Sequence, residues 1–344
     1  MRPKKRTEMT NDPKNPQILI SDRDSGLPYS KGLMASQVMV TGLSPVRAYQ
    51  VAEAIEDRLR ELGVPSISNA QLGELALGVL EDLAGERYAR NFQRWREIEA
   101  LQVPLVVLIG GATGVGKSTL ATQLATRLGI VRVVATDAIR EVMRALFSHE
   151  LMPTLHASSF EAGSVLREPP SKDEVVVGFR EQTAAVAVGV QALVERAAME
   201  GTHLIIEGAH VVPGFLDLEP WRERILAVPV VVTIEEDEVH RSHFAARASE
   251  QTGRPSQRYL DRFDDIRRVQ RYIKSQALSH GVPVIANYSF DRALAAIIDL
   301  VMERATERTS QARIPGGSGG SRSERERASG SPPATVPAIE GGRT

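Results

Sequence analysis

The residues with the clearest chemistry form a phosphate-binding loop of the type G-x-x-x-x-G-K-[ST]. An unbroken apolar run, residues 105–110, precedes the loop, and a helix-like segment follows it, which is the context that such a loop requires. Glycines let the backbone curl so that successive N–H groups face phosphate oxygens. Lys117 can reach the β- and γ-phosphates, and the Ser118 hydroxyl can bind Mg²⁺. We therefore expect ATP and Mg²⁺ at the residues of this phosphate loop: Gly111, Ala112, Thr113, Gly114, Val115, Gly116, Lys117, Ser118 and Thr119.

Two carboxylates are expected beside this loop. Asp137 follows the second predicted strand, and Glu207 ends the third. In a doubly wound fold these strand ends face the same crevice as the phosphate loop, so both acids can join Ser118 in holding Mg²⁺. Asp137 can also accept the proton of an acceptor hydroxyl. Two plainer roles stay open: Asp137 or Thr136 can cap the next helix, and Glu207 can be a polar turn residue.

Arginines are concentrated after the fourth predicted strand, in residues 237–272. The eight arginines of this segment are at positions 241, 247, 254, 258, 262, 267, 268 and 271. Their position favours a mobile lid that brings cations to a transferring phosphate. We expect Arg247 to be catalytic and Arg241 to bind substrate, with a solvated helix surface as the alternative.

Two earlier helical segments supply further cations for an anionic substrate. Arg140 and Arg144 have the spacing of residues on one helix face, and Arg180 lies near the start of a long helix. We assign Arg140 and Arg180 to substrate binding, and an ordinary solvated face competes with that role, above all for Arg144.

Histidines do not indicate a metal site. His240 and His243 have helical i,i+3 spacing but no evident third ligand, which argues against zinc. His210 stands alone near the end of a predicted strand, where a hydrogen-bonded structural role is the common one.

Five apolar runs place these residues on one fold. The runs are residues 105–110, 130–135, 203–210, 227–234 and 282–287, and helical patterns separate them. This alternation predicts an α/β fold, a doubly wound and mainly parallel five-stranded sheet. Ser171-x-x-Glu174 has the form of a capping box and predicts the start of the long helix, which ends near Met199.

The segment before this sheet resembles an ATP-cone, a small nucleotide-sensing module of a short sheet and several helices. The likeness rests on an apolar run at 17–20, the segment 27–31 and the helical patterns that follow. It departs from the usual pattern where Asp22-Arg23 replaces a Lys-Arg pair, and a purely structural cap on the core is the alternative. The expected division is a disordered tail (1–16), the ATP-cone-like domain (17–95), a P-loop kinase domain (96–308) and a second disordered tail (309–344).

Composition narrows the classes of protein. The 344 residues carry a net charge of −1, which gives no reason to expect nucleic acid or membrane as a partner. The sequence has no cysteine, which excludes disulfides, thiolate zinc sites and a cysteine nucleophile. No apolar run has transmembrane length, and the first residues contain no signal-peptide pattern, so a cytoplasmic protein is expected.

Four segments together resemble the 2-phosphoglycerate kinase family, and the likeness covers about residues 17–305. They are residues 106–119, 135–144, 178–182 and 205–214, the last with the pattern E-G-x-H-x-x-P-G. The resemblance implies transfer of the γ-phosphoryl group of ATP to the 3-hydroxyl of 2-phosphoglycerate, which gives 2,3-bisphosphoglycerate.

Three alternatives remain at this point. Another phosphorylated metabolite can be the acceptor of a kinase with this layout. A regulatory ATPase is a second possibility, although the third strand ends in Glu-Gly and no L-S-G-G-Q sequence occurs. An ATP-sensing binding module is the third, suggested by the N-terminal segment.

Overall fold

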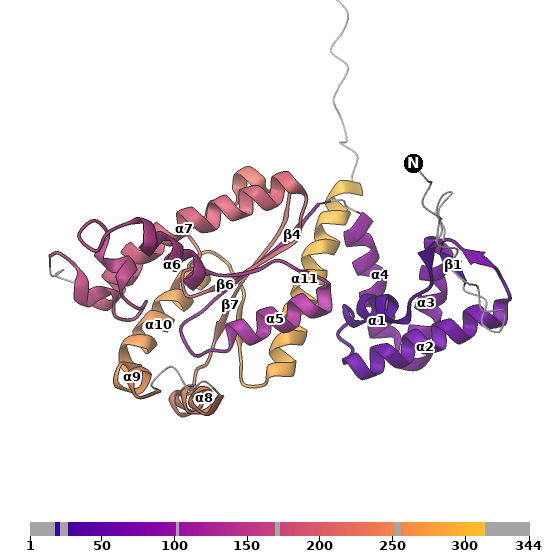
Figure 1. Cartoon of the computed structure of the whole chain (residues 1–344), viewed down its shortest axis with the longest axis horizontal. Coiled ribbons are helices and arrows are strands. Elements are labelled where there is room, and N and C mark those ends of the chain that lie inside the picture. Colours follow the sequence, from indigo (N-terminus) through magenta and orange to yellow (C-terminus); the bar gives the residue numbers. More distant parts are fainter. Residues whose placement is uncertain (1–17, 21–26, 101–102, 169–172, 251–255, 314–344) are drawn as a thin grey trace, which may run out of the picture.

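The computed structural model describes residues 18–20, 27–100, 103–168, 173–250 and 256–313; the side chains of residues 99–100, 245–250, 256 and 311–313 are outside this description. In the described part, an N-terminal helical unit lies beside a larger unit built around a parallel sheet (Figure 1). Among these residues no helix is long and apolar enough to cross a membrane.

The N-terminal unit has its own small sheet and core. The sheet has the order β2-β1-β3 in the described residues, and the elements are β1 (Leu19–Ile20), β2 (Leu27–Pro28), α1 (Lys31–Met39), α2 (Pro45–Leu62), β3 (Ser66–Ile67), α3 (Asn69–Ala84) and α4 (Glu86–Ala100). Local sequence sets these boundaries: Ser44 caps α2, Gly63 ends it in a left-handed conformation, and Ser68 forms a capping box with Gln71. The ATP-cone likeness stays a prediction, and Asp22-Arg23 is outside the described residues.

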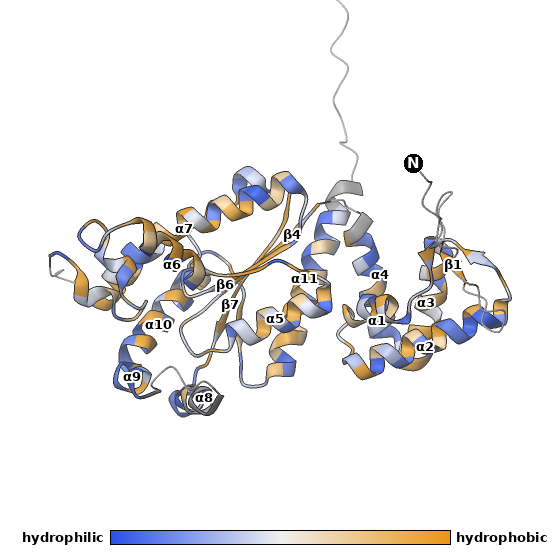
Figure 2. Ribbon diagram, viewed as in Figure 1, coloured by the Kyte–Doolittle hydropathy of each residue, from blue (hydrophilic) through white to orange (hydrophobic). Residues whose placement is uncertain are grey.

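The larger unit confirms the predicted doubly wound sheet. Its five strands in the described residues are all parallel, in the order β5-β6-β4-β7-β8. They are β4 (Leu105–Gly110), β5 (Val133–Ala135), β6 (Leu204–Gly208), β7 (Leu226–Thr233) and β8 (Val284–Ala286). Strand β4 is buried over its whole length because both faces of the sheet are covered, as the run of apolar residues at the centre of Figure 2 shows.

Helices cover both faces of this sheet. They are α5 (Lys117–Leu128), α6 (Thr136–Leu146), α7 (Glu174–Glu200), α8 (Asp237–Glu250), α9 (Ser256–Asp261), α10 (Phe263–Ser279) and α11 (Phe290–Arg313), and 3₁₀ turns occur at Pro153–His156, Ala162–Val165 and Glu219–Trp221. Alternate residues of β4 face two different cores: Val107 packs with α5, α10 and α11, whereas Val106 packs with α7. The phosphate loop lies at the carboxyl end of β4, where the neighbouring strands also end.

Two helix boundaries differ from their predictions. The cap of α7 is Asp173, whose carboxylate accepts from the N–H groups of Val175 and Val176, so the helix does not begin at a Ser171 capping box. Ser171 itself is outside the described residues. Helix α11 continues to Arg313, beyond the expected end of the kinase domain at 308, and residues 1–16 and 314–344 of the predicted tails are not described.

Helix α4 joins the two units. Phe92 belongs to the core of the N-terminal unit, whereas Trp95 and Ile98 belong to the core beneath the parallel sheet. The guanidinium of Arg127, in the last turn of α5, also donates to the carbonyl oxygen of Gly42 at 3.0 Å. The predicted boundary at 95/96 therefore falls inside a continuous helix that both cores share.

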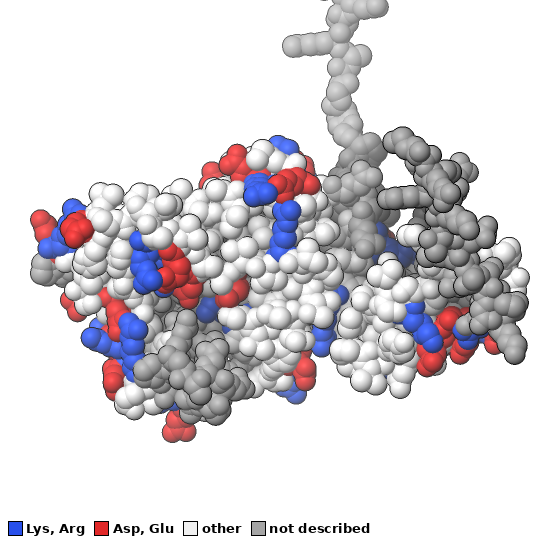
Figure 3. Space-filling model, viewed as in Figure 1, with Lys and Arg blue, Asp and Glu red and all other residues white. Residues whose placement is uncertain are grey.

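Basic and acidic side chains are mixed on the face shown in Figure 3, where they lie next to one another in small groups. Exposed ion pairs of the described residues include Arg132 with Glu200 at 2.6 Å. Exposed pairs of this kind contribute little to the free energy of folding.

Candidate active site

A cavity of about 800 Å³ opens at the carboxyl ends of β4, β5 and β6. Its walls come from the phosphate loop, the first two turns of α6, residues 156–160, the tip of β6 and α9. This is the position at which open α/β sheets bind ligands.

Phosphate-loop and acidic side chains meet at the base of the cavity. The Ser118 hydroxyl donates to Oε1 of Glu207 at 2.9 Å, and the Lys117 ammonium donates to the carbonyl oxygen of Ala112 at 2.8 Å. Glu207 is 6% exposed and Lys117 is 8% exposed, yet both line the cavity. The structure therefore brings the hydroxyl and the ammonium of the phosphate loop together with a carboxylate from a distant segment of the sequence.

Two histidines of α8 hold the phosphate loop from its outer side. Nε2 of His240 lies 2.8 Å from the carbonyl oxygen of Thr113, and Nδ1 of His243 lies 3.0 Å from that of Gly114. Because a carbonyl oxygen can only accept, both ring nitrogens must carry the proton. Burial lowers the pKa of His240 to about 4, so this ring is neutral at pH 7.

Asn287, after β8, extends this arrangement to a third consecutive peptide. Its side-chain amide donates to the carbonyl oxygen of Val115 at 2.9 Å. In a trans peptide the N–H points opposite to the C=O. Carbonyls held outward at residues 113, 114 and 115 therefore turn the following N–H groups toward the inside of the loop, where phosphate oxygens bind.

Gly114 permits this close approach. A Cβ atom at this position would lie 2.5 Å from Cζ of Phe244 and 3.0 Å from Nε2 of His240, and the glycine has φ of +89°. Phe244 in turn stacks on Tyr259, a residue of α9 that lines the cavity. The glycine requirement at this position thus comes from the packing of α8 as well as from phosphate binding.

Asp137 lies in the first turn of α6, and its side chain is 74% exposed at the cavity wall. The alternative that Asp137 or Thr136 caps this helix is wrong: the N-cap position is Ala135, and no side chain caps it. Oδ1 of Asp137 lies 3.6 Å from Nε of Arg140. The carboxylate is thus available to a bound molecule and is accompanied by a cation.

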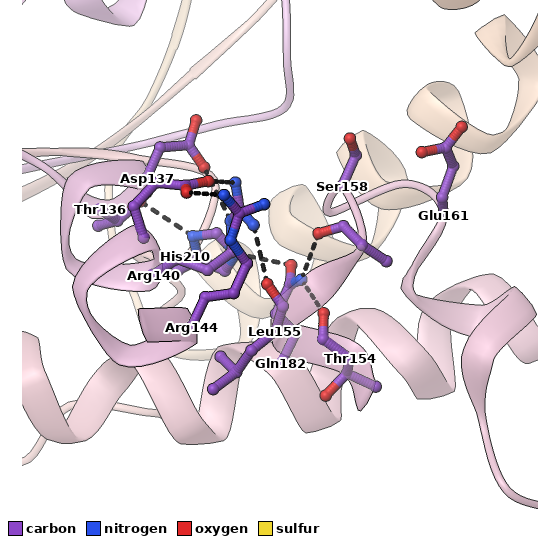
Figure 4. A network of polar contacts seen from close by, with 12 residues as sticks. Thr136, Asp137, Arg140, Arg144, Thr154, Leu155, Ser158, Glu161, Gln182 and His210 are labelled. Carbon is purple, nitrogen blue, oxygen red and sulfur yellow. Dashed lines mark hydrogen bonds and ion pairs between the residues drawn. The ribbon is translucent and has the colours of Figure 1, made fainter. Parts of the chain in front are cut away.

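Three arginines of the described part line the cavity, and each is paired with a carboxylate. Figure 4 shows two of them, Arg140 and Arg144, beside Asp137. Arg140 is largely buried and donates both to the carbonyl oxygen of Leu155 and to Glu141, each at 2.8 Å. Arg144 pairs with the same Glu141. Arg258 of α9 reaches across to Glu161 and to the Ser158 hydroxyl, the latter at 3.1 Å.

The other predicted arginines are placed differently. Arg241 lies with its guanidinium carbon 3.8 Å from the centre of the Phe263 ring, and it does not line the cavity. Arg180 is exposed and does not line the cavity. It lies close enough to Tyr272 that its charge lowers the pKa of that tyrosine, although burial has the larger effect and the pKa is raised overall. Arg247 belongs to α8, but its side chain is outside the described residues.

Sequence reasoning missed several contributors to this site. Ser158 and Tyr259 carry no motif, and Arg258 was one of eight arginines with no feature to separate it. The helical spacing of His240 and His243 was visible in the sequence, but their role in holding the loop was not foreseen. His210 is buried and hydrogen-bonded, as expected of a structural histidine.

Known proteins resemble this chain over most of its length. A 2-phosphoglycerate kinase from Methanopyrus kandleri is 36% identical over 302 residues, which are 86% of this chain and 90% of that protein. One from Methanothermobacter thermautotrophicus is 40% identical and covers 82% of this chain and 91% of its own. A 2-phosphoglycerate kinase from Thermococcus kodakarensis is 37% identical, and the match covers 83% of this chain and 97% of that protein.

Comparisons with solved structures and with protein-family models add little to the likeness to these relatives. A putative kinase from Chloroflexus aurantiacus covers 60% of this chain and 98% of its own, at 17% identity and a TM-score of 0.35. No protein-family model matches the chain.

Proposed function

The chain belongs to the 2-phosphoglycerate kinase family, and from that premise we propose that it transfers the γ-phosphoryl group of ATP to the 3-hydroxyl of 2-phosphoglycerate, giving 2,3-bisphosphoglycerate. Membership of the family confirms the prediction from the sequence motifs and makes the chain a kinase. The observation that carries the proposal is that, among the described residues, one cavity is lined by the phosphate loop, three acids (Asp137, Glu141 and Glu207) and three arginines.

The acceptor end of this cavity suits a small molecule with two anionic groups. 2-Phosphoglycerate carries a carboxylate and a phosphate, and guanidinium groups bind both in a two-pronged geometry. We propose that Arg140, Arg144 and Arg258 bind these groups. Because these arginines are now paired with Glu141 and Glu161, a bound acceptor would take over part of their hydrogen bonding from the carboxylates.

The nucleotide end suits ATP with Mg²⁺. Ser118, Glu207 and Asp137 offer the oxygen ligands that Mg²⁺ prefers. No group of three or more His, Cys, Asp or Glu residues in the described part could hold a metal alone. We propose that Ser118, Glu207 and Asp137 would hold a Mg²⁺ ion together with nucleotide phosphates and water, and that the ion would neutralise charge on the β- and γ-phosphates.

The remaining roles follow from position. Lys117 binds the phosphoryl oxygens, because its ammonium is at the end of the loop that surrounds them. Asp137 accepts the proton from the attacking hydroxyl, since its exposed carboxylate lines the same cavity as the phosphate loop. Arg247 stabilises charge on the transferring group from α8.

A coupled assay of ADP release tests the proposal. The purified protein with Mg-ATP should release ADP faster when 2-phosphoglycerate is added, and phosphate analysis should show 2,3-bisphosphoglycerate in equal amount. The matched acceptor is 3-phosphoglycerate, which has the same charge but its hydroxyl and phosphate exchanged. The Lys117→Ala variant controls for contaminating ATPases.

Two results would contradict the proposal. ADP release that 2-phosphoglycerate does not increase above the acceptor-free rate would exclude this acceptor. Rapid ADP release without any acceptor would favour a regulatory ATPase instead.

A further inference from the structure

A buried chain of hydrogen bonds runs behind the cavity, from α6 through the tip of β6 to α7 (Figure 4). Thr136, His210 and Gln182 form it, and all three side chains are fully buried. Oγ1 of Thr136 lies 3.0 Å from Nδ1 of His210, and Nε2 of His210 lies 2.8 Å from Oε1 of Gln182. None of the three is among the described residues that line the cavity.

The direction of every hydrogen bond in this chain is fixed. Nε2 of Gln182 faces the carbonyl oxygens of Thr154 and Ala157, the latter at 3.0 Å, and carbonyl oxygens can only accept. The amide oxygen of Gln182 must therefore accept from Nε2 of His210. Burial lowers the pKa of His210 to about 4, so the ring is neutral and its Nδ1 accepts from the Thr136 hydroxyl. Each donor in the chain has one acceptor of the right kind.

One end of the chain holds the loop that forms the acceptor wall. Gln182 binds two of its carbonyls, and Arg140 binds the carbonyl of Leu155 between them. These hydrogen bonds hold the backbone of the loop. Residues 156–160 line the cavity, and the guanidinium of Arg258 donates a hydrogen bond to the Ser158 hydroxyl. The position of this wall relative to α6 and α7 thus depends on the Gln182 amide.

The other end of the chain is next to both acids. Thr136 precedes Asp137, and it packs on Gly208, which follows Glu207: a Cβ on Gly208 would lie only 1.8 Å from Oγ1 of Thr136. The absence of a side chain at Gly208 is what allows the hydroxyl to reach His210. The same chain therefore connects the backbone segments that carry the acids to the loop that faces them.

We propose that Gln182 and His210 are positioning residues for acceptor binding: they fix the wall at residues 153–160 at the distance from Asp137 and Glu207 that the acceptor requires. This rests on the proposed function, in which the acceptor occupies this part of the cavity. A positioning role predicts a selective effect, because among the described residues the hydrogen bonds of Gln182 and His210 go to Thr136, Thr154, Ala157 and each other and not to the phosphate loop.

Two variants break the chain without a large change in volume. Gln182→Met keeps the length of the side chain but removes its donors, and Thr136→Val removes only the hydroxyl. Each should raise the KM for 2-phosphoglycerate about tenfold or more, because a buried polar group loses its partner. The KM for ATP should stay within about twofold of the unchanged protein.

Two further variants serve as matched controls. Thr136→Ser restores a hydroxyl and should restore the KM for 2-phosphoglycerate. Thr183→Val changes a neighbouring, fully buried threonine of α7 whose hydroxyl has no hydrogen-bond partner in the described residues. It should leave both KM values unchanged.

Hydrogen exchange gives a readout that does not depend on the acceptor. Amides of residues 154–160 should exchange about tenfold faster in Gln182→Met and in Thr136→Val, whereas amides of β4 should not change. If the unchanged protein does not phosphorylate 2-phosphoglycerate, the proposed function fails, and this exchange comparison still decides whether the chain positions the wall.

Unchanged exchange and an unchanged KM for 2-phosphoglycerate in folded variants would overturn the inference. The inference would also be overturned if the KM for ATP and the KM for 2-phosphoglycerate rose by the same factor and kcat fell by that factor, because this result indicates a general structural defect. If Gln182→Met does not fold, the comparison of Thr136→Val with Thr136→Ser decides.

Discussion

The hydroxyl of Ser118 donates a hydrogen bond to Oε1 of Glu207 at 2.9 Å, although 89 positions separate the two residues in the sequence. The parallel register explains this contact, because Glu207 is paired with Ile109 of β4, shortly before the phosphate loop begins. Adjacent strands thus deliver a hydroxyl and a carboxylate to one place, and these are the two oxygen groups that we propose as Mg²⁺ ligands.

Glu207→Gln tests this pair. Glutamine has the same size and can still accept from Ser118, but it lacks the negative charge. We expect kcat to fall by roughly 10²–10³-fold and the Mg²⁺ concentration for half-maximal rate to rise. The exposed Glu200, which pairs with Arg132 and Arg196, offers the control Glu200→Gln, with no effect on either quantity. An unchanged Mg²⁺ dependence in Glu207→Gln would remove this residue from the metal site.

His240→Phe tests the support of the phosphate loop from α8. Phenylalanine keeps a flat ring but leaves the Thr113 carbonyl without its donor, which should lower the free energy of unfolding by about 1–3 kcal/mol. The KM for ATP should rise while the KM for the acceptor does not. Nδ1 of His280 lies 2.8 Å from a backbone carbonyl oxygen that does not belong to the phosphate loop, that of Gln276, so His280→Phe is the control. Equal effects of the two substitutions on the KM for ATP would contradict a role specific to the loop.

Stability should fall as the pH is lowered from 6.5 toward 4. Burial holds the pKa of His210 and of His240 at about 4 in the folded protein, below the ordinary value of 6.5. The unfolded chain therefore takes up these protons first, and the stabilisation that is complete above pH 6.5 is lost through this range, by roughly 3 kcal/mol for each histidine. Denaturant unfolding between pH 7.5 and 4.5 measures it. The slope should be shallower in His240→Phe; an identical slope would show that this histidine does not titrate as described.

Arg258→Ala tests the acceptor end of the cavity. Loss of a guanidinium from a bidentate anion site should raise the KM for 2-phosphoglycerate by about tenfold to 100-fold, with a small effect on ATP. Arg241 is the matched control, since it is an arginine of α8 that packs on Phe263 outside the cavity. A larger effect of Arg241→Ala than of Arg258→Ala would favour the original prediction from the sequence.

Arg247→Ala tests the proposed catalytic cation. If this residue stabilises charge on the transferring phosphoryl group, kcat should fall by roughly 10²–10³-fold with the fold intact. Single-turnover rates with saturating ATP and acceptor separate this effect from binding. A loss of less than about threefold would assign Arg247 to the protein surface.

The parts of the fold that the sequence predicted are those with local signals. The phosphate loop and Asp137 follow apolar strands, Glu207 lies at the end of one, and adjacency in a parallel sheet brought Ser118 and Glu207 together as expected. The start of α7 was misplaced because two acceptable N-caps lie close together, and Asp173 binds the free N–H groups.

The supports of the site could not be read in the same way. His240 bonds a carbonyl 127 positions away, and Asn287 bonds one 172 positions away. No local pattern encodes such pairs, since the backbone oxygen that accepts is present in every residue. Arg258 lines the cavity because α9 lies beside it, and nothing in the neighbouring sequence distinguishes this arginine from the other arginines of the segment.

Helix α4 has a mechanical consequence for the kinase. Phe92 of this helix packs in the core of the N-terminal unit, and Ile98 packs in the core beneath the parallel sheet. Because both cores are closely packed, a tilt of α4 in one core also shifts its side chains in the other. Arg127 fastens the far end of α5 to the N-terminal unit at Gly42, while the near end of α5 bears Lys117 and Ser118. A displacement of the N-terminal unit is therefore transmitted to α5, the helix that carries Lys117 and Ser118.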